Sequence, residues 1–312
     1  MHGKGQVIKT AGSSFVVMTD GGEHIGCTLA GRYRLEDLKT TNPVVVGDQV
    51  SFETGGEEGK GRILEVFERK NYIIRRSSKL SKSYQIIASN IDQLLLLVTL
   101  VRPVTHAEFI DRYLVTAQAY NIPAILLFNK TDIYASRDQE KMQELLAVYE
   151  KIPYRCITLS ALMKTNLEPV ASLMKSRTSL VSGISGSGKS TLINSIDPGL
   201  DLPTGNLSTR HNAGRHTTSH AEMHPLGFGG YVIDTPGIKG FGVTDMNEEP
   251  IDHYFPEFFR KSASCRYNNC RHVSEPGCTV LEALEQGAIS ASRYRSYLSL
   301  LDEQKAFSKY RR

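Results

Sequence analysis

Gly183-Ile184-Ser185-Gly186-Ser187-Gly188-Lys189-Ser190 is a glycine-rich stretch that ends in a lysine and a hydroxyl side chain. A short apolar run, residues 179–182, precedes it, and residues 190–196 have the composition of a helix start. Strand, loop and helix form the context in which a G-x-x-x-x-G-K-[ST] pattern binds phosphate. Its glycines allow backbone N–H groups to turn inward around phosphate oxygens, at the positive end of the following helix. The stretch therefore predicts a P-loop α/β domain.

The loop assigns a role to each of its polar groups. Lys189 is expected to reach the β- and γ-phosphates of a nucleotide, and the Ser190 hydroxyl to ligate Mg²⁺. Thr191, the next residue, is expected to donate to the α-phosphate. The alternative is a glycine-rich turn with a chance lysine, which arises about once per hundred chains of this length. The pattern therefore needs support from a second motif.

That support is Asn129-Lys130-Thr131-Asp132, which follows the buried-strand run Ala124-Ile-Leu-Leu-Phe128. Guanine presents two donors on one edge, and the Asp132 carboxylate can accept both, whereas adenine presents an acceptor there. A site built around such a hydrogen-bond pair can discriminate by roughly 10⁴–10⁵. Asn129 and Lys130 are expected to brace the loops and cover the base. The alternative for Asp132 alone is a helix N-cap, but beside a phosphate loop the tetrapeptide predicts GTP and GDP as ligands.

The order of the two motifs is unusual. In ordinary GTPases the phosphate loop comes first, whereas here the guanine-binding tetrapeptide precedes it. Both motifs must converge on one nucleotide, so we predict a circularly permuted GTPase domain. The permutation lets the segment after the γ-phosphate sensor lead directly into another domain.

A third motif, Gly230-Tyr-Val-Ile-Asp234-Thr-Pro-Gly237, is expected to deliver Asp234 to Mg²⁺ and the Gly237 N–H to the γ-phosphate. Upstream lies Arg215-His216-Thr217-Thr218, in which a switch threonine should close over Mg²⁺. Spacing leaves Thr217 and Thr218 as alternatives. Ser160-Ala161-Leu162, after the strand-like residues 155–159, is expected to back the base.

Ile238 stands where Ras-like enzymes carry the glutamine that orients the attacking water. Isoleucine can neither donate nor accept a hydrogen bond. Either the chain hydrolyses GTP poorly or another group takes the role. His216 is the candidate, because a neutral imidazole can accept a hydrogen bond from water near pH 7. The alternative is a solvent-exposed loop histidine without a catalytic part.

Residues 1–73 contain five short segments rich in β-formers, separated by Gly and Asp turn signals. Five such strands predict an OB-like barrel, a fold that often binds nucleic acid. Lys/Arg and Asp/Glu are equal in number over residues 1–75, so a purely structural barrel is the alternative. Basic clusters lie elsewhere, at residues 75–82 and from Arg293 onward, and either could be a phosphate-binding patch or a solvated face.

Cys265-x₄-Cys270-x-His272-x₅-Cys278 is the remaining constellation. Three thiolates and one imidazole complete the tetrahedral shell of a structural Zn²⁺. Free core cysteines and a redox pair are the alternatives. Helices are expected at residues 279–284 and 291–307, on the C-terminal side of this cluster.

Length and composition limit the class of protein. The chain has 312 residues, enough for two or three domains, and a net charge of +4. Its five cysteines are too few and too clustered for a disulfide scaffold. It contains no apolar run long enough to span a membrane. We expect a cytoplasmic monomer that does not interact with membranes.

The chain resembles the ribosome small-subunit-dependent GTPase family in its barrel, its inverted motif order, Ile238 and its Cys/His spacing. Members of that family are circularly permuted bacterial GTPases that assist late assembly of the 30S subunit. Residues 215–218 also match the family's switch pattern. The resemblance implies an N-terminal OB-like β-barrel (1–73), a circularly permuted P-loop α/β GTPase domain (74–242) and a C-terminal, mainly helical zinc-binding domain (243–312).

The resemblance also implies a checkpoint factor whose GTPase activity is stimulated by the 30S subunit and whose barrel contacts 16S rRNA. The alternative is an RNA-binding clamp that uses GTP as an order switch with negligible turnover. Ile238 favours the clamp, and His216 favours catalysis.

Overall fold

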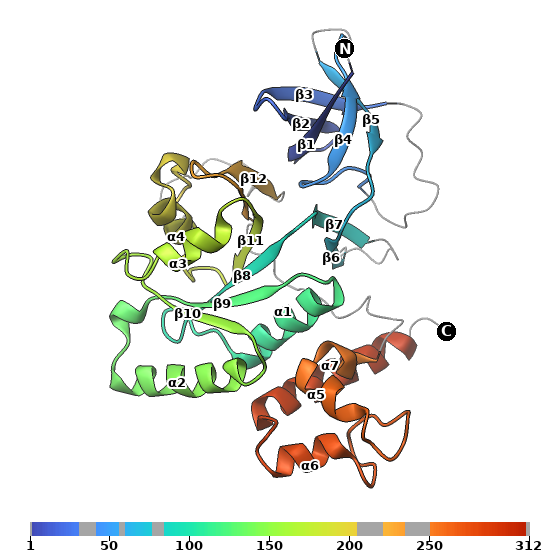
Figure 1. Cartoon of the computed structure of the whole chain (residues 1–312), viewed down its shortest axis with the longest axis vertical. Coiled ribbons are helices and arrows are strands. Elements are labelled where there is room, and N and C mark those ends of the chain that lie inside the picture. The colour runs from blue at the N-terminus through green and yellow to red at the C-terminus, as the bar shows by residue number, and fades with distance from the viewer. Residues whose placement is uncertain are drawn as a thin grey trace.

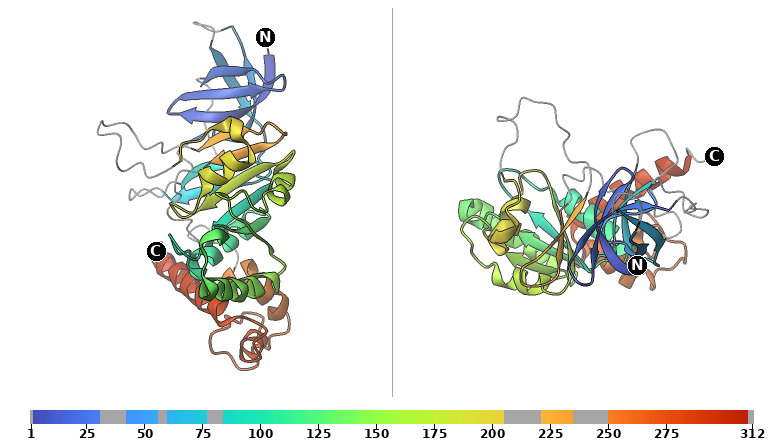
Figure 2. Two further views of the ribbon diagram at one scale, coloured as in Figure 1. Left: turned by 90° about the vertical axis from the view of Figure 1, so that its left-hand side faces the viewer. Right: turned by 90° about the horizontal axis from the view of Figure 1, so that it is seen from above.

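The computed structural model describes residues 2–30, 42–55, 60–76, 84–204, 221–234 and 250–309. Three units follow one another along the long axis of the molecule (Figures 1 and 2). A β-barrel lies at one end, an α/β sheet in the middle, and a helical unit at the other end. The fold class predicted from the sequence is confirmed.

The barrel consists of β1 (His2–Ala11), β2 (Ser14–Thr19), β3 (His24–Leu29), β4 (Gln49–Glu53) and β5 (Gly61–Val66). Their order is β1-β2-β3-β5-β4, and pairing of β1 with β4 closes it. Alternate residues point inward, as expected for strands with one buried face. Val7, Val17, Val50 and Ile63 form the fully buried interior. The five predicted strands are all present.

A buried polar network fastens the barrel to the segment that follows it. Asp48 is fully buried and accepts hydrogen bonds from Arg69, at 2.7 Å, and from the Ser89 hydroxyl, at 2.6 Å. Ser89 ends β7 (Tyr84–Ser89), which pairs with β6 (Tyr72–Arg76) in a two-stranded hairpin. Because Asp48 is fully desolvated, this pairing is needed to offset the cost of burying its charge.

The central sheet has the strand order β10-β9-β8-β11-β13-β12. Five strands are parallel: β8 (Gln93–Val98), β9 (Ala124–Phe128), β10 (Arg155–Thr158), β11 (Thr178–Gly183) and β13 (Tyr231–Asp234). Strand β12 (Glu222–Pro225) is the antiparallel edge. Strands β8 and β11 are buried along their whole length, because helices cover both faces of the sheet.

Helices α1 (Ala107–Ala119) and α2 (Ser136–Glu150) pack on one face of this sheet, and α3 (Glu168–Met174) and α4 (Lys189–Ile196) pack on the other. The P-loop strand β11 lies at the centre of the sheet, with β8 and β9 on one side and β13 on the other. Strands β8 and β9 precede β11 in the chain, which is the permuted order expected from the motifs.

The barrel continues the central sheet. Strand β1 pairs with β12, so that eleven strands of the described ranges form one sheet. Ile8 and Met18 of the barrel belong to the same buried cluster as Met223 and Ile233 of the central sheet. The outer side chains of the barrel therefore belong to the hydrophobic core of the central sheet.

The C-terminal unit contains the 3₁₀ turn η5 (Ile251–Tyr254) and helices α5 (Pro256–Ser262), α6 (Thr279–Glu285) and α7 (Ala291–Lys309). Phe255, Phe258 and Tyr297 form its core, together with Val115 of α1. Both predicted helices are present. Among the described residues, no helix has the length and apolar character needed to cross a membrane.

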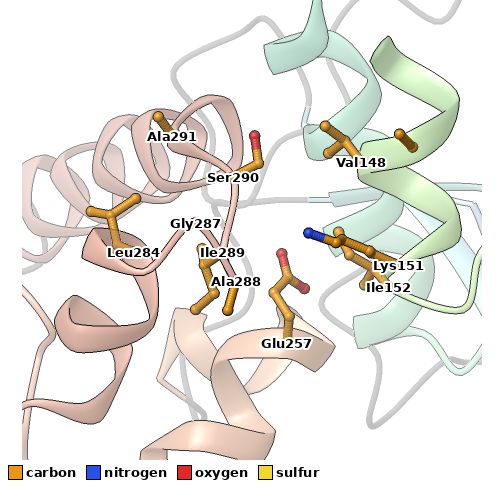
Figure 3. A pocket seen from close by; sticks show the side chains of 11 residues that line it. Val148, Lys151, Ile152, Glu257, Leu284, Gly287, Ala288, Ile289, Ser290 and Ala291 are labelled. Carbon is orange, nitrogen blue, oxygen red and sulfur yellow. The ribbon is translucent and has the colours of Figure 1, made fainter. Parts of the chain in front are cut away.

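The C-terminal unit contacts the central domain through buried charged side chains along α1. A cavity separates the two near the end of α2. Arg293 is fully buried and pairs with Asp111 of α1, at 2.8 Å, and with Glu257 of α5, at 2.7 Å. A cavity of about 380 Å³ lies between the end of α2 and residues 287–291, where Lys151 and Glu257 face each other (Figure 3). The tight contact is therefore made along α1.

Candidate nucleotide site and metal cluster

The glycine-rich loop joins the end of β11 to the start of α4. Gly183, Gly186 and Gly188 have φ values of +148°, +79° and +99°, a region that other residues rarely adopt. A Cβ atom on Gly183 would lie 2.9 Å from the Leu97 carbonyl oxygen. The glycines are therefore required both by the turn and by the close approach of β8.

Lys189 turns its ammonium group into the loop. Its Nζ donates to the carbonyl oxygens of Gly183, at 2.9 Å, and Ile184, at 3.1 Å. Burial lowers the pKa of Lys189, and the nearby Asp234 carboxylate partly offsets this effect. The Ser187 hydroxyl is buried without a hydrogen-bond partner among the described residues. A partly buried cation and an unsatisfied hydroxyl in one loop suit an anionic ligand.

Asn129 connects all three loops of the site. Its Nδ2 donates to the Ser187 carbonyl, at 2.9 Å, and its Oδ1 accepts from the Ala161 N–H, also at 2.9 Å. The side chain is buried. A Cβ atom on Gly188 would lie 2.5 Å from its Nδ2 atom. One amide thus ties residues 129–132 to the glycine-rich loop and to the loop that begins at Ser160.

Lys130 lies beside the phosphate loop. Its Nζ donates to the carbonyls of Arg102, at 2.5 Å, and Gly186, at 2.8 Å. Burial lowers the pKa of Lys130, while Asp132 raises it. Residues 99–105, which follow β8, were absent from the sequence-based site. Their position after a central parallel strand is the signal that could have indicated them.

Asp132 lies in the 3₁₀ turn η2 (Thr131–Ile133) and accepts a hydrogen bond from the Ser160 hydroxyl at 2.5 Å. The Thr131 hydroxyl donates to the Leu159 carbonyl. Tyr134 donates to the Asn129 carbonyl at 2.6 Å. Ser160 was expected in the loop that backs the base, but its hydrogen bond to Asp132 was not predicted. For Tyr134, no sequence pattern pointed to a role in the site.

Ser190 and Thr191 lie in the first turn of α4, and Asp234 ends the neighbouring strand β13, opposite Val181 of β11. A hydroxyl and a carboxylate are the hard oxygen donors that Mg²⁺ prefers. Ser190 and Asp234 therefore fit the coordination of a nucleotide-bound Mg²⁺. The remaining predicted residues lie outside the described part of the chain: Arg215, His216, Thr217, Thr218, Gly237 and Ile238.

A second cluster lies in the C-terminal unit. The ligand atoms of Cys265, Cys270, His272 and Cys278 all lie within 4.8 Å of one another. The Cys265 and Cys278 sulfurs are 4.0 Å apart, and His272 Nδ1 lies 3.3 Å from the Cys278 sulfur. A tetrahedral Zn²⁺ requires about 3.8 Å between sulfurs and about 3.5 Å between sulfur and nitrogen. The cluster can therefore hold a metal ion.

Two carboxylates support the cluster. Asp252 Oδ2 lies 3.4 Å from His272 Nε2, the arrangement that orients a metal-binding imidazole and leaves Nδ1 toward the metal. Glu275 accepts from the backbone N–H groups of Arg271, Val273 and Ser274. Burial alone would raise the pKa of Glu275, but these N–H groups lower it to about 2. The chain between the cluster residues is thus ordered around a charged carboxylate.

Comparison with known proteins agrees with this geometry. The family model described as RsgA GTPase matches residues 66–244. A relative from Christiangramia forsetii, named small ribosomal subunit biogenesis GTPase RsgA, is 50% identical over 301 residues, which cover 96% of each chain. A relative of the same name from Bacteroides fragilis is 50% identical over 308 residues, which cover 99% of each chain.

Two solved structures resemble the whole chain. YjeQ from Thermotoga maritima is 34% identical with a TM-score of 0.79, and the match covers 97% of this chain and 99% of that one. YloQ, described as a circularly permuted GTPase, is 28% identical with a TM-score of 0.74, over 98% of this chain and 96% of that one. Sequence, permuted topology and site geometry agree, and the chain belongs to the RsgA GTPase family.

Proposed function

We propose that this GTPase hydrolyses GTP to GDP and phosphate as a maturation checkpoint factor of the small ribosomal subunit. The observation that carries the proposal is the Asn129 side chain, which joins the loops expected to bind guanine, the base face and the phosphates. Relatives of half-identical sequence over nearly the whole chain are named for biogenesis of the small subunit. The working form is a cytoplasmic monomer. Its barrel (1–73) contacts RNA, its GTPase domain (74–242) carries out catalysis, and its zinc-binding domain (243–312) docks on the ribosomal subunit.

In the proposed complex, Asp132 accepts from the guanine edge while Ser160 fixes its carboxylate. The Lys189 ammonium leaves the loop carbonyls that it contacts in the free protein and binds β- and γ-phosphate oxygens instead. The negative charge of the phosphates then stabilises the charged ammonium, which burial disfavours. Thr191 donates to the α-phosphate. Ser190, Asp234 and one of Thr217 and Thr218 would hold Mg²⁺, which neutralises charge on the phosphates.

His216 orients the water that attacks the γ-phosphate. The backbone N–H of Gly237 donates a hydrogen bond to the γ-phosphate. Ile238 cannot orient water, so a side chain from the other switch segment has to do so. We expect His216→Ala to lower 30S-stimulated turnover by roughly 10²–10⁴ while GTP still binds. His224→Ala, on β12, is the matched control. Wild-type turnover of His216→Ala would contradict this role.

The metal proposed for the C-terminal cluster is one structural Zn²⁺, held by Cys265, Cys270, His272 and Cys278. A shell of three thiolates and one imidazole leaves no open position for chemistry.

The surface of α5 and of the loop after it carries exposed aromatic and basic side chains. Phe259 and Tyr267 are exposed, and the Arg266 guanidinium lies over the Tyr267 ring. Aromatic and cationic groups together suit RNA, since bases stack and phosphates pair.

Phosphate release, titrated with purified 30S or 50S subunits, tests the proposal. We expect 30S subunits to stimulate GTP hydrolysis, within the range of about 10³–10⁵ seen when a catalytic group is ordered, and 50S subunits to have little effect. Negligible turnover with either subunit, despite GTP-dependent binding to 30S, would favour the clamp. Equal stimulation by both subunits would contradict the proposed specificity.

A further inference from the structure

One row of charged residues crosses from the barrel to the nucleotide site. Strand β1 pairs with β12 at Lys9 and Glu222, and β12 pairs with β13 at Glu222 and Asp234. Residues directly opposite in antiparallel strands share a face, with Cβ atoms about 4.5–5.5 Å apart. Lys9, Glu222 and Asp234 therefore stand side by side on three adjacent strands.

The neighbours of these residues show which face they occupy. Ile8, Met223 and Ile233 belong to one buried cluster. Side chains alternate along a strand, so the charged row lies on the opposite face, which is the face that α4 covers farther along the sheet. Asp234 lies opposite Val181, near the end of β11 just before the glycine-rich loop, and Lys189 begins α4 after that loop. The row thus ends beside the phosphate loop.

The row brings two like charges together. Carboxylates placed directly opposite one another, as Glu222 and Asp234 are, repel each other. Lys9 Nζ lies 2.9 Å from Glu222 Oε1, and both side chains are partly exposed. The ion pair holds the Glu222 carboxylate on the barrel side and offsets its charge.

We propose that Lys9, a residue of the barrel, is a positioning residue for the phosphate end of the nucleotide. Lys9 neutralises the Glu222 carboxylate, and this reduces the negative charge that faces the bound phosphates. The inference rests on the proposed role of Asp234 at the phosphates and Mg²⁺. GTP carries one more negative charge than GDP, so its binding depends more strongly on this pairing.

Calorimetry on the full chain tests the proposal, with GDP and a non-hydrolysable GTP analogue in Mg²⁺ at low salt. Lys9→Gln should lower affinity for the GTP analogue about two- to fivefold, as expected for a partly exposed pair, and affect GDP less. Adding Glu222→Gln to Lys9→Gln should restore the affinity. The difference should disappear at about 1 M salt, where charges are screened within about 3 Å.

Lys70→Gln is the matched control. Lys70 and Asp92 form an ion pair of the same length, 2.9 Å, with similar exposure, in the segment that joins the barrel to β8. This control should leave both affinities unchanged, and thermal unfolding will show that every variant is folded. An unchanged ratio of GTP-analogue to GDP affinity in Lys9→Gln, or a double variant as weak as the single one, overturns the proposal. Failure of the wild type to prefer GTP over ATP would instead contradict the proposed function.

Discussion

At the scale of single residues, Asn129 determines how the site is assembled. The tetrapeptide and the glycine pattern could be recognised from sequence because each has fixed internal spacing. The hydrogen bonds of Asn129 could not, since its partners, Ser187 and Ala161, lie far away in the chain and meet it only in the folded sheet. The same holds for Ser160 on Asp132, where the sequence suggested only a base-backing loop.

Asn129→Ala should weaken GDP and GTP binding together. The substitution removes two hydrogen bonds and leaves a buried carbonyl and a buried N–H without partners, at about 1–3 kcal/mol for each unsatisfied group. Calorimetric nucleotide binding and urea unfolding would measure the two effects. Gln139→Ala is the control, because Gln139 lies in α2 and its side chain donates to the Tyr134 carbonyl in the same region. Unchanged affinity in Asn129→Ala would show that the amide does not organise the loops.

At the scale of elements, the barrel strands could be predicted from their β-forming residues and turn signals, and β11 from the apolar run before the glycine-rich loop. Helices α6 and α7 were also predicted from the sequence. Strand β12 was not predicted, because Glu222-Met-His-Pro225 is short and polar and becomes a strand only by pairing with β13 and β1. The metal cluster was found from spacing alone. Its supports, Asp252 and Glu275, were missed because one lies upstream and the other acts through backbone groups.

Glu275→Gln should accelerate loss of metal to a chelator at pH 7. The folded-state pKa of Glu275, about 2, lies below its ordinary value. Its stabilising effect is therefore fully present above about pH 4.5 and is lost as the pH falls toward 2. The neutral glutamine removes the charge at every pH. Metal release, followed with a colorimetric chelator, should be faster than in wild type and in Glu282→Gln, a control on the exposed side of α6. Equal rates in all three proteins would contradict the role of Glu275.

At the scale of the whole molecule, the permuted order of motifs predicted the central domain, but not how the flanking units attach to it. The barrel joins through an edge strand and a shared core, and the C-terminal unit joins through charges buried against α1. Both contacts depend on tertiary packing between distant segments. Arg293 shows the limit clearly, since the sequence placed it in a basic cluster, whereas the structure buries it completely.

Arg293→Met should destabilise the protein by about 3–5 kcal/mol, because Asp111 and Glu257 would remain buried without their cation. Adding Asp111→Leu and Glu257→Leu should recover much of the loss, since well-packed apolar groups can replace a buried ion cluster. Urea unfolding of the metal-loaded protein measures both changes. A loss below about 1 kcal/mol in Arg293→Met would mean that the cluster contributes little to holding the C-terminal unit on α1.

The most direct measurement is calorimetric titration of the metal-replete protein with GTP, GDP and ATP, repeated on Asp132→Asn. A single guanine pocket assembled from β9, β11 and the loop after β10 predicts saturable binding of GTP and GDP and none of ATP over the same range. It also predicts that Asp132→Asn loses guanine nucleotides, by up to about 10⁴-fold, because an amide donor would face the guanine donors. Uptake of ATP as readily as GTP, or full GTP affinity in Asp132→Asn, would contradict the existence of that pocket.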